Sequence, residues 1–301
     1  NHGSDLGYTR NIAQLPANSA GFATANKAAP FPVWAHISQY TNGARSNYEA
    51  VTFAANKRLS KGIQFNTSYV FAKNLSNGAG YNPTGFAGEA GGMVTDQFNP
   101  NLDYGNVAFT HRHRMLSTFL YNLPFGKGNA FLGKSNKLVD ELVGGWQLSG
   151  VMLFQTGPFL TVVAPGADPA GNNFPNLEGA GRADAVAGVS TIPATQSVNS
   201  WINAAAYAIP KNNIGRPGNS AVGSVVGPGT QAVSLSMFKT FPITERVRFQ
   251  LGAAISNAFN HPNYATPNTN LGTAPFGTIN NVQAQENGGP RSIQLTGRIS
   301  F

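Results

Sequence analysis

The stretch GIQFNTSYVFAKN (residues 62–74) decides the fold class, because two kinds of side chain alternate along it. The larger, mostly apolar ones occupy one register, which comprises Ile63, Phe65, Thr67, Tyr69 and Phe71. The other register is mainly polar, with Gln64, Asn66, Ser68 and Asn74. A period of two residues is that of a β-strand whose two faces meet different surroundings. The stretch therefore predicts a strand with one apolar and one polar face.

The same alternation recurs along the chain. It is clear at 233–241, 246–259 and 292–301 and shorter around 50–56, and further strands are expected at roughly 112–122 and 145–163. The facing of the strand at 112–122 is ambiguous, because Met115, Phe119 and Tyr121 compete with Leu116 and Leu120 for the apolar register. The pattern predicts an all-β protein with about seven antiparallel strands.

The composition excludes two other classes of protein. The chain has 35 Gly and 19 Pro in 301 residues, yet 41% of its residues are hydrophobic and only 11% are charged. A disordered chain would carry more charge and fewer aromatic residues. The longest apolar runs span only about four residues, whereas a membrane-spanning helix needs about 20. We therefore expect neither a disordered protein nor a helical membrane protein.

The connections between the expected strands differ in length in a regular way. Those at 59–61 and 242–245 are tight, whereas 75–110, 165–230 and 260–290 are long and rich in Gly, Asn and Pro. Outer-membrane barrels combine short periplasmic turns with long extracellular loops in this manner. One longer connection, 124–144, falls at the tight-turn end, and we expect a small helix at 136–143. The pattern favours a transmembrane β-barrel over a secreted β-sandwich.

The positions of charged residues support a membrane-spanning sheet. A Lys or Arg on the lipid face costs roughly 2–4 kcal/mol at the bilayer midplane and little near the interface. In the clearly phased strands, the charges on the apolar register all lie near strand ends: Glu49, Lys57, Lys73, Lys239 and Arg291. Arg248 and Arg298, well inside their strands, fall on the polar register, which would face the lumen.

Several segments carry a resemblance to a known family. In chain order they are GSDLGYTRNIAQLP, ISQYTNGARSNYEAV, NKRLSKGIQFNTSYVFAKN, HRHRMLSTFLYNLPFGKG, VGGWQLSG, FNHPNYATPN and RSIQLTGRISF. In order and spacing they resemble the C-terminal barrel portion of Oar-like TonB-dependent outer-membrane transporters. The resemblance implies a complete barrel of about 22 strands, closed by an N-terminal plug. It also implies that the plug, the TonB-contacting segment and the signal peptide lie upstream of these residues.

On this reading residues 1–301 are the C-terminal part of the barrel. Residues 1–45 would be a truncated strand end (1–5) followed by an extracellular loop, and 46–301 would supply the seven strands, ending at the periplasmic side with Phe301. A terminal Phe on an alternating strand is typical of an assembly signal for the barrel-assembly machinery.

The resemblance implies a function for the whole protein in the bacterial outer membrane. That function is energy-coupled transport, in which the long loops capture a bulky ligand and TonB acts on the missing plug. Lipid and lipopolysaccharide would surround the barrel. The alternative is a non-transporting, adhesin-type surface barrel. No cofactor is expected.

Few residues suggest other chemistry. His111 and His113 would project to one face of a strand, and Asp96 or Asp103 would supply a third metal ligand. They are weak candidates, since the neighbouring Arg112 and Arg114 would repel a cation. A strand that begins with polar residues at the membrane interface explains the histidines equally well.

A phosphate-binding pattern also occurs by residue type, in Gly128, Gly133, Lys134 and Ser135. It lacks the buried strand before it and the Asp-ended strand after it that nucleotide binding needs, and a basic periplasmic turn explains it better. There is no Cys, and the carboxylates are scattered. The basic residues form no compact run interleaved with aromatics, so we expect neither an enzyme nor a nucleic-acid-binding protein.

Two features remain as candidate functional sites. Arg248 and Arg298 would lie on adjacent strands, on the lumen face near the periplasmic end, where they either face acidic groups of a plug or remain hydrated. The long loops carry aromatic residues that would suit sugars, peptides or proteins as ligands: Tyr81, Phe86, Phe98, Phe174, Trp201 and Tyr207.

Overall fold

The computed structural model shows one large antiparallel sheet. It describes residues 1–21, 31, 37–78, 94–172, 181–244, 246–284 and 288–301. The long strands are β1 (His2–Asn11), β2 (Ser38–Ser60), β3 (Ile63–Ser76), β5 (His113–Asn122), β6 (Trp146–Gln155), β11 (Thr230–Pro242), β12 (Arg248–Ser256) and β13 (Ser292–Ser300). They pair in the order β1-β2-β3-β5-β6-β11-β12-β13. The expected all-β, antiparallel architecture is thereby confirmed.

The shorter elements lie in the connections. They are 3-10 helices η3 (Pro100–Asp103) and η4 (Ala204–Ala206), helix α2 (Lys137–Val143), and the two-residue strands β4 (Gly105–Asn106), β7 (Phe159–Leu160), β8 (Asp184–Ala185), β9 (Tyr207–Ala208) and β10 (Val225–Val226). Within the described ranges, no helix combines the length and apolar character needed to cross a membrane. The helix expected at 136–143 is confirmed as α2, which Asn136 caps by accepting a hydrogen bond from the amide of Val139 at 2.9 Å.

Three boundaries differ from expectation. β1 continues to Asn11 and β2 begins at Ser38, so the predicted loop of 6–45 is much shorter, and β1 adds a strand to the seven expected. Both registers of 38–46 are polar, which hides the alternation. The strand expected at 145–163 ends at Gln155, because Gly157 and Pro158 interrupt it; a Cβ on Gly157 would lie 1.8 Å from the carbonyl oxygen of Gly227.

The registers give the sheet one apolar and one polar face. Directly paired residues share a face, and successive pairings align Phe53 with Tyr69, Met115 and Phe154. They likewise align Leu148 with Met237, Ala253 and Leu295. Such rows of paired residues run across the strands from β2 to β13, and they define the apolar face of the sheet. It resolves the facing of β5, because Met115, Phe119 and Tyr121 pair with apolar-face residues of β3.

The opposite face is mostly polar. Its residues include Gln64, Asn66, Ser68, Thr118, Ser149, Ser234, Ser236, Gln250, Gln294 and Thr296. Apolar exceptions on this face are Val70, Leu120, Val151, Phe238 and the paired Leu116 and Leu153. Phe238 lies over Gly252, where a Cβ would approach the ring within 2.1 Å; on the apolar face, Gly150 makes similar room for Phe119. Glycine at these two sites lets an aromatic ring cover the backbone of the neighbouring strand.

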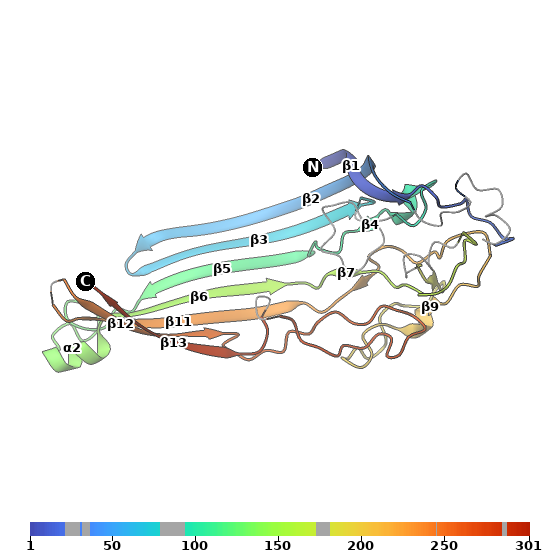
Figure 1. Ribbon diagram of the computed structural model, residues 1–301. Helices are drawn as coiled ribbons and strands as arrows, with labels where there is room; N and C mark the ends of the chain where they lie inside the picture. Colours follow the sequence, from blue (N-terminus) through green and yellow to red (C-terminus); the bar gives the residue numbers. More distant parts are fainter. Residues whose placement is uncertain (22–30, 32–36, 79–93, 173–180, 245, 285–287) are drawn as a thin grey trace.

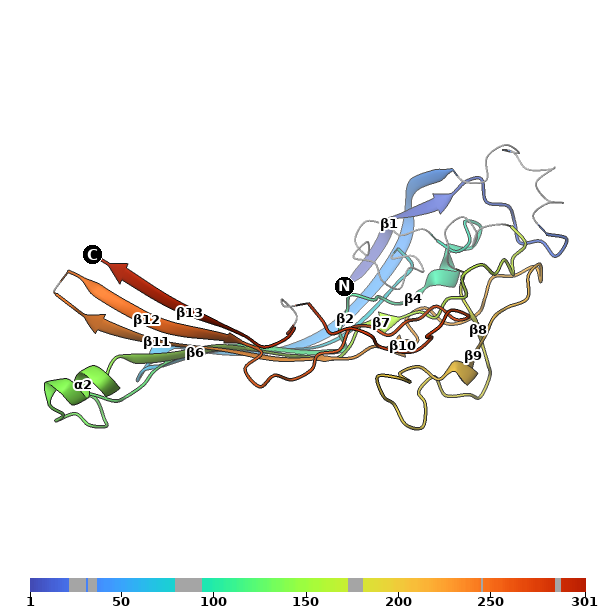
Figure 2. The same ribbon diagram turned by 60° about the horizontal axis from the view of Figure 1, so that its bottom comes forward.

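The two ends of the sheet are different in kind (Figure 1). Tight turns, α2 and the chain terminus gather at one end, which we call the tight-turn end. There the β2–β3 connection is a two-residue turn in which Lys61 and Gly62 both have positive φ, as hairpin turns of this type require. The long connections extend from the other end. The sheet stays open, since the pairing order ends at β1 and β13 (Figure 2).

Candidate functional site

The long connections form a folded unit, which we call the loop assembly: the described residues of 12–37, 77–112, 156–229 and 257–291. A hydrophobic core lies within it, made of Leu160, Val162, Ala164, Ala167, Ala183, Ile202, Ala206, Tyr207 and Val225, with Trp201, Leu271 and Phe276 packed against it. Backbone hydrogen bonds tie the connections together, as at Val163, whose amide and carbonyl bond to Thr269 and Leu271. The loop assembly therefore presents a shaped surface at the end of the sheet (Figure 1).

A buried ion pair joins two of the connections. Asp103, fully buried at the end of η3, lies 4.0 Å from a guanidinium nitrogen of Arg182 and accepts hydrogen bonds from the amide and hydroxyl of Thr95, each at 2.6 Å. Arg182 also donates to the carbonyl oxygens of Leu102 and Ser220 at 3.0 and 3.1 Å. Burial raises the pKa of Asp103, although Arg182 and Thr95 oppose that rise. The pair fixes the 77–112 connection against 156–229.

Side-chain amides make further links between the connections. Gln14 donates to the carbonyl oxygen of Thr95 at 2.7 Å and accepts from the amide of Gln97 at 2.8 Å. Asn172 donates to the carbonyl oxygen of Leu15 at 3.1 Å. Asn263, almost fully buried, accepts from the amide of Gln231 at 2.7 Å and donates to Gly288 at 2.6 Å. These amides attach the loop assembly to itself and to the end of β11.

An exposed ion pair lies at the surface of the loop assembly. Both guanidinium nitrogens of Arg216 donate to the carboxylate of Asp184, at 2.7 and 2.9 Å. The hydrogen bond from Arg216 lowers the pKa of Asp184. Because Arg216 is 47% exposed, we assign this pair a small energetic role and use it below as a control.

The loop aromatics have different surroundings. Phe98 is 59% exposed and available to a ligand. Tyr207 is buried in the core, and the indole nitrogen of Trp201, which packs on that core, donates to the carbonyl oxygen of Val226 at 2.9 Å. Tyr81, Phe86 and Phe174 lie outside the described residues. Of the described three, Phe98 is thus the candidate ligand contact, while the other two shape the loop assembly.

The histidines are engaged elsewhere. Nδ1 of His111 lies 2.6 Å from the carbonyl oxygen of Thr156, and Nδ1 of His113 lies 2.8 Å from the hydroxyl of Tyr69. Asp103 belongs to the buried pair, and Asp96 accepts a hydrogen bond from the amide of Phe98 at 2.9 Å. Among the described residues, no three His, Asp or Glu side chains gather as metal ligands. Burial lowers the pKa of His111.

In the glycine-containing turn before α2, the backbone amides donate hydrogen bonds to carbonyl oxygens of the same turn. The amides of Gly126, Gly128 and Ser135 donate to the carbonyl oxygens of Phe131, Gly133 and Leu132 at 3.0, 3.2 and 3.0 Å. A phosphate-binding loop would instead aim such amides at the phosphates. This geometry explains the pattern as a tight turn.

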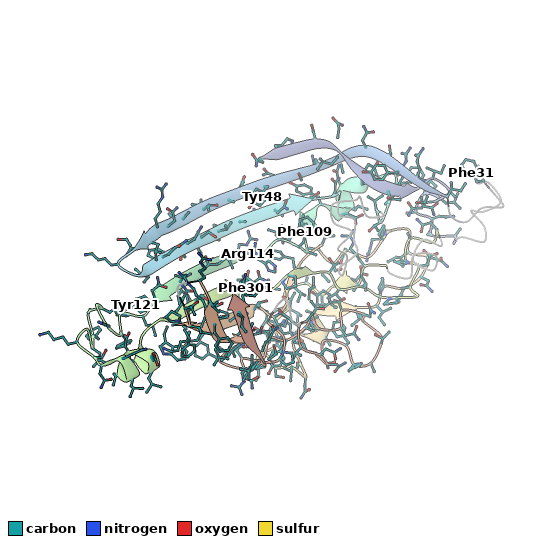
Figure 3. The ribbon with its side chains drawn as sticks, turned by 60° about the vertical axis from the view of Figure 1, so that its left-hand side comes forward. Phe31, Tyr48, Phe109, Arg114, Tyr121 and Phe301 are labelled. Carbon is teal, nitrogen blue, oxygen red and sulfur yellow. The ribbon has the colours of Figure 1, made fainter. Side chains whose placement is uncertain are left out.

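The remaining sequence candidates lie at the tight-turn end. Arg298 pairs with Gln250 and Arg248 with Ser300, which places both arginines on adjacent strands and on the polar face, as expected. Phe301 is 98% exposed at the end of β13 (Figure 3). Contact with a plug and a role in assembly remain predictions. No sequence pattern predicts the Asp103–Arg182 pair, because its members belong to different loops.

Comparison with known proteins agrees with the sheet. A family model described as an outer membrane beta barrel domain matches residues 1–294. No curated protein matches the chain.

Proposed function

Because the chain belongs to the family of outer-membrane β-barrel domains, we propose that it forms the barrel portion of an energy-coupled, TonB-dependent transporter. The family places the chain in the bacterial outer membrane. The apolar face then meets lipid, and the polar face lines the lumen. The loop assembly lies outside the cell, where it captures a bulky ligand.

The open sheet with a polar inner face is the observation that carries this proposal. β1 and β13 end the pairing order and leave backbone groups for further strands. We take the complete barrel to be wide, as the resemblance to 22-stranded transporters implies, and a wide barrel with a polar interior is a water-filled channel unless a plug closes it. A plugged barrel that admits large ligands requires energy to open, and this is the role we assign to TonB.

The loop assembly supports capture of a bulky ligand. Its core, the buried pair Asp103–Arg182 and the amide links hold its surface in shape before any ligand arrives. Binding to a pre-shaped surface loses less conformational entropy than binding to a flexible one. We expect the ligand to be larger than a drug-sized molecule, because the surface is spread over several connections.

The test uses the native-length protein encoded by the gene, purified from outer membranes. We expect the purified periplasmic domain of TonB to bind it in a pull-down and by calorimetry. The absence of binding by both methods would contradict a TonB-dependent transporter.

The adhesin-type barrel is the second outcome of that experiment. It is supported if TonB does not bind and if deletion of the gene abolishes attachment of cells to a surface without affecting nutrient uptake. Energy-dependent accumulation of a ligand that copurifies with the protein supports transport instead.

A further inference from the structure

We propose that α2 and the connection around it, residues 124–144, form an anchor that lies on the phospholipid leaflet at the tight-turn end of the barrel. Apolar side chains of this anchor enter the acyl-chain region, and its lysines meet anionic headgroups. The proposal goes beyond transport; it rests on the location of the chain in the outer membrane and on the proposed orientation, with the tight-turn end on the periplasmic side.

The first observation is a cluster of exposed apolar side chains. Leu138 and Leu142, one helical turn apart on the same face of α2, are 74% and 73% exposed. Other large apolar side chains of the connection are also exposed, namely Phe125, Phe131, Leu132 and Val139. Single exposed apolar residues are ordinary, but several in one short connection mark a surface that meets a membrane or a partner.

The second observation is the side of the sheet on which α2 is held. Trp146 and Lys239 are paired in register, and both belong to the apolar face. The indole nitrogen of Trp146 donates to the carbonyl oxygen of Leu142 at 3.0 Å, and Nζ of Lys239 donates to that of Gly144. The C-terminal end of α2 is therefore attached to the face that meets lipid.

The attachment is compatible with an interfacial position. Nζ of Lys239 lies 5.3 Å from the ring centroid of Trp146 and 5.0 Å from that of Phe241. Aromatic rings and a hydrogen-bonded lysine are characteristic of the boundary between headgroups and acyl chains. The cation on the apolar face thus lies beside the C-terminal end of α2. The helix itself lies at the tight-turn end of the sheet (Figure 2).

The third observation is the charge of this end. Basic residues are numerous in the turns, strand ends and helix of this end: Lys57, Arg58, Lys61, Lys127, Lys134, Lys137 and Arg246. The acidic residues of the connection are engaged, since Asp140 accepts a hydrogen bond from the amide of Lys127 and Glu141 lies 3.9 Å from Lys137. A helix with an apolar face and flanking lysines binds membrane interfaces, and anionic lipids strengthen that binding.

These observations favour lipid over a protein partner as the occupant. The exposed apolar side chains belong to a connection whose C-terminal end is bonded to residues of the lipid-facing side of the sheet, and the surrounding charge is complementary to anionic headgroups. A protein partner would need neither feature, and it becomes one outcome of the test.

The test measures the depth of a spin label in the bilayer. The described chain contains no Cys, so a Leu138→Cys variant carries one label here, in a native-length protein whose other cysteines, if any, are replaced. Lys137→Cys, whose side chain is 90% exposed and lies about 100° around α2 from Leu138, away from Leu142, is the matched control. Both proteins are reconstituted in vesicles of phosphatidylethanolamine and phosphatidylglycerol. We expect the label at 138 to collide with oxygen and lose access to a water-soluble nickel chelate, and the label at 137 to stay accessible to the chelate.

Two results would overturn the proposal. Equal access of the chelate to both labels in vesicles would exclude an anchored helix. Protection of position 138 in isolated outer membranes but not in vesicles would identify a protein partner instead. Omission of phosphatidylglycerol, or the double substitution Lys134→Gln with Lys137→Gln, should reduce the depth of the label at position 138 in the bilayer. An unchanged depth would overturn the proposed contact between the lysines and anionic headgroups. Heat-modifiable gel mobility verifies folding, and Leu142→Cys provides a second labelling site.

Discussion

Replacement of Arg182 by alanine should loosen the loop assembly while leaving the sheet intact. Arg182→Ala removes the partner of the fully buried Asp103 and two hydrogen bonds to carbonyl oxygens. Breaking a buried ion pair on one side costs about 3–5 kcal/mol. At a factor of ten for each 1.4 kcal/mol, local opening should become roughly one hundred- to several thousandfold more frequent. Uptake of a proton by Asp103, whose pKa burial already raises, keeps the cost near the lower figure at acidic pH.

Hydrogen exchange followed by mass spectrometry measures this effect. The informative amides are those of Ala183 and Ser220, which donate to the carbonyl oxygens of Val162 and Ala183 at 3.1 and 2.9 Å. Arg216→Ala is the matched control, because it removes an exposed Arg–Asp pair from the same loop assembly. Such a pair contributes about 0.2–1 kcal/mol, so exchange should accelerate by no more than about fivefold.

The reasoning is refuted if the two variants exchange at similar rates. A second comparison separates the charge from the packing. Asp103→Leu combined with Arg182→Met leaves no lone buried charge and should recover much of the protection that Arg182→Ala loses. Protection that stays as low as in the single variant would show that hydrogen bonding by Arg182, not the unpaired carboxylate, determines the stability.

The remaining predictions concern the sheet and its two ends. Gly252→Ala should destabilise the sheet by about 1–3 kcal/mol, because a Cβ there overlaps an aromatic ring, whereas Gly297→Ala, whose Cβ meets only ordinary contacts, should be nearly neutral in urea unfolding followed by gel mobility. Burial lowers the pKa of His111, so the unfolded state binds more protons than the folded state just below pH 6.5. Proteolytic resistance of the loop assembly should therefore fall as the pH drops through that value, and His111→Gln should abolish this dependence. Reversal of charge at Arg248 and Arg298 together should weaken retention of a plug in the native-length protein; unchanged retention and uptake would leave the two arginines as hydrated lumen charges.

The strands were predictable where the two faces meet different solvents. In 62–74 the register that faces lipid must be apolar and the other need not be, which produces the alternation in the sequence. The same reasoning fails at β1 and in the first part of β2, because both registers there are polar. The facing of β5 was also undecided from its own residues, and pairing with Tyr69 and Phe65 of β3 determines it.

The loop assembly was predictable only as long connections rich in Gly, Asn and Pro. Its core brings together residues such as Leu160, Ile202 and Val225, which no periodicity links. The sequence suggests Asp103 only as a weak metal ligand, since its partner Arg182 lies in another connection. Contacts between loops depend on the sheet that places the loop ends side by side. A local pattern in the sequence therefore does not predict them.

The amide links have a consequence for the environments in which the surface keeps its shape. Gln14, Asn172 and Asn263 carry no charge at any ordinary pH, and dissolved ions do not screen hydrogen bonds between neutral groups as they screen exposed ion pairs. The links that these three side chains make should therefore depend less on ionic strength than the exposed Arg216–Asp184 pair does. Salt that weakens that pair at the surface leaves these connections in place.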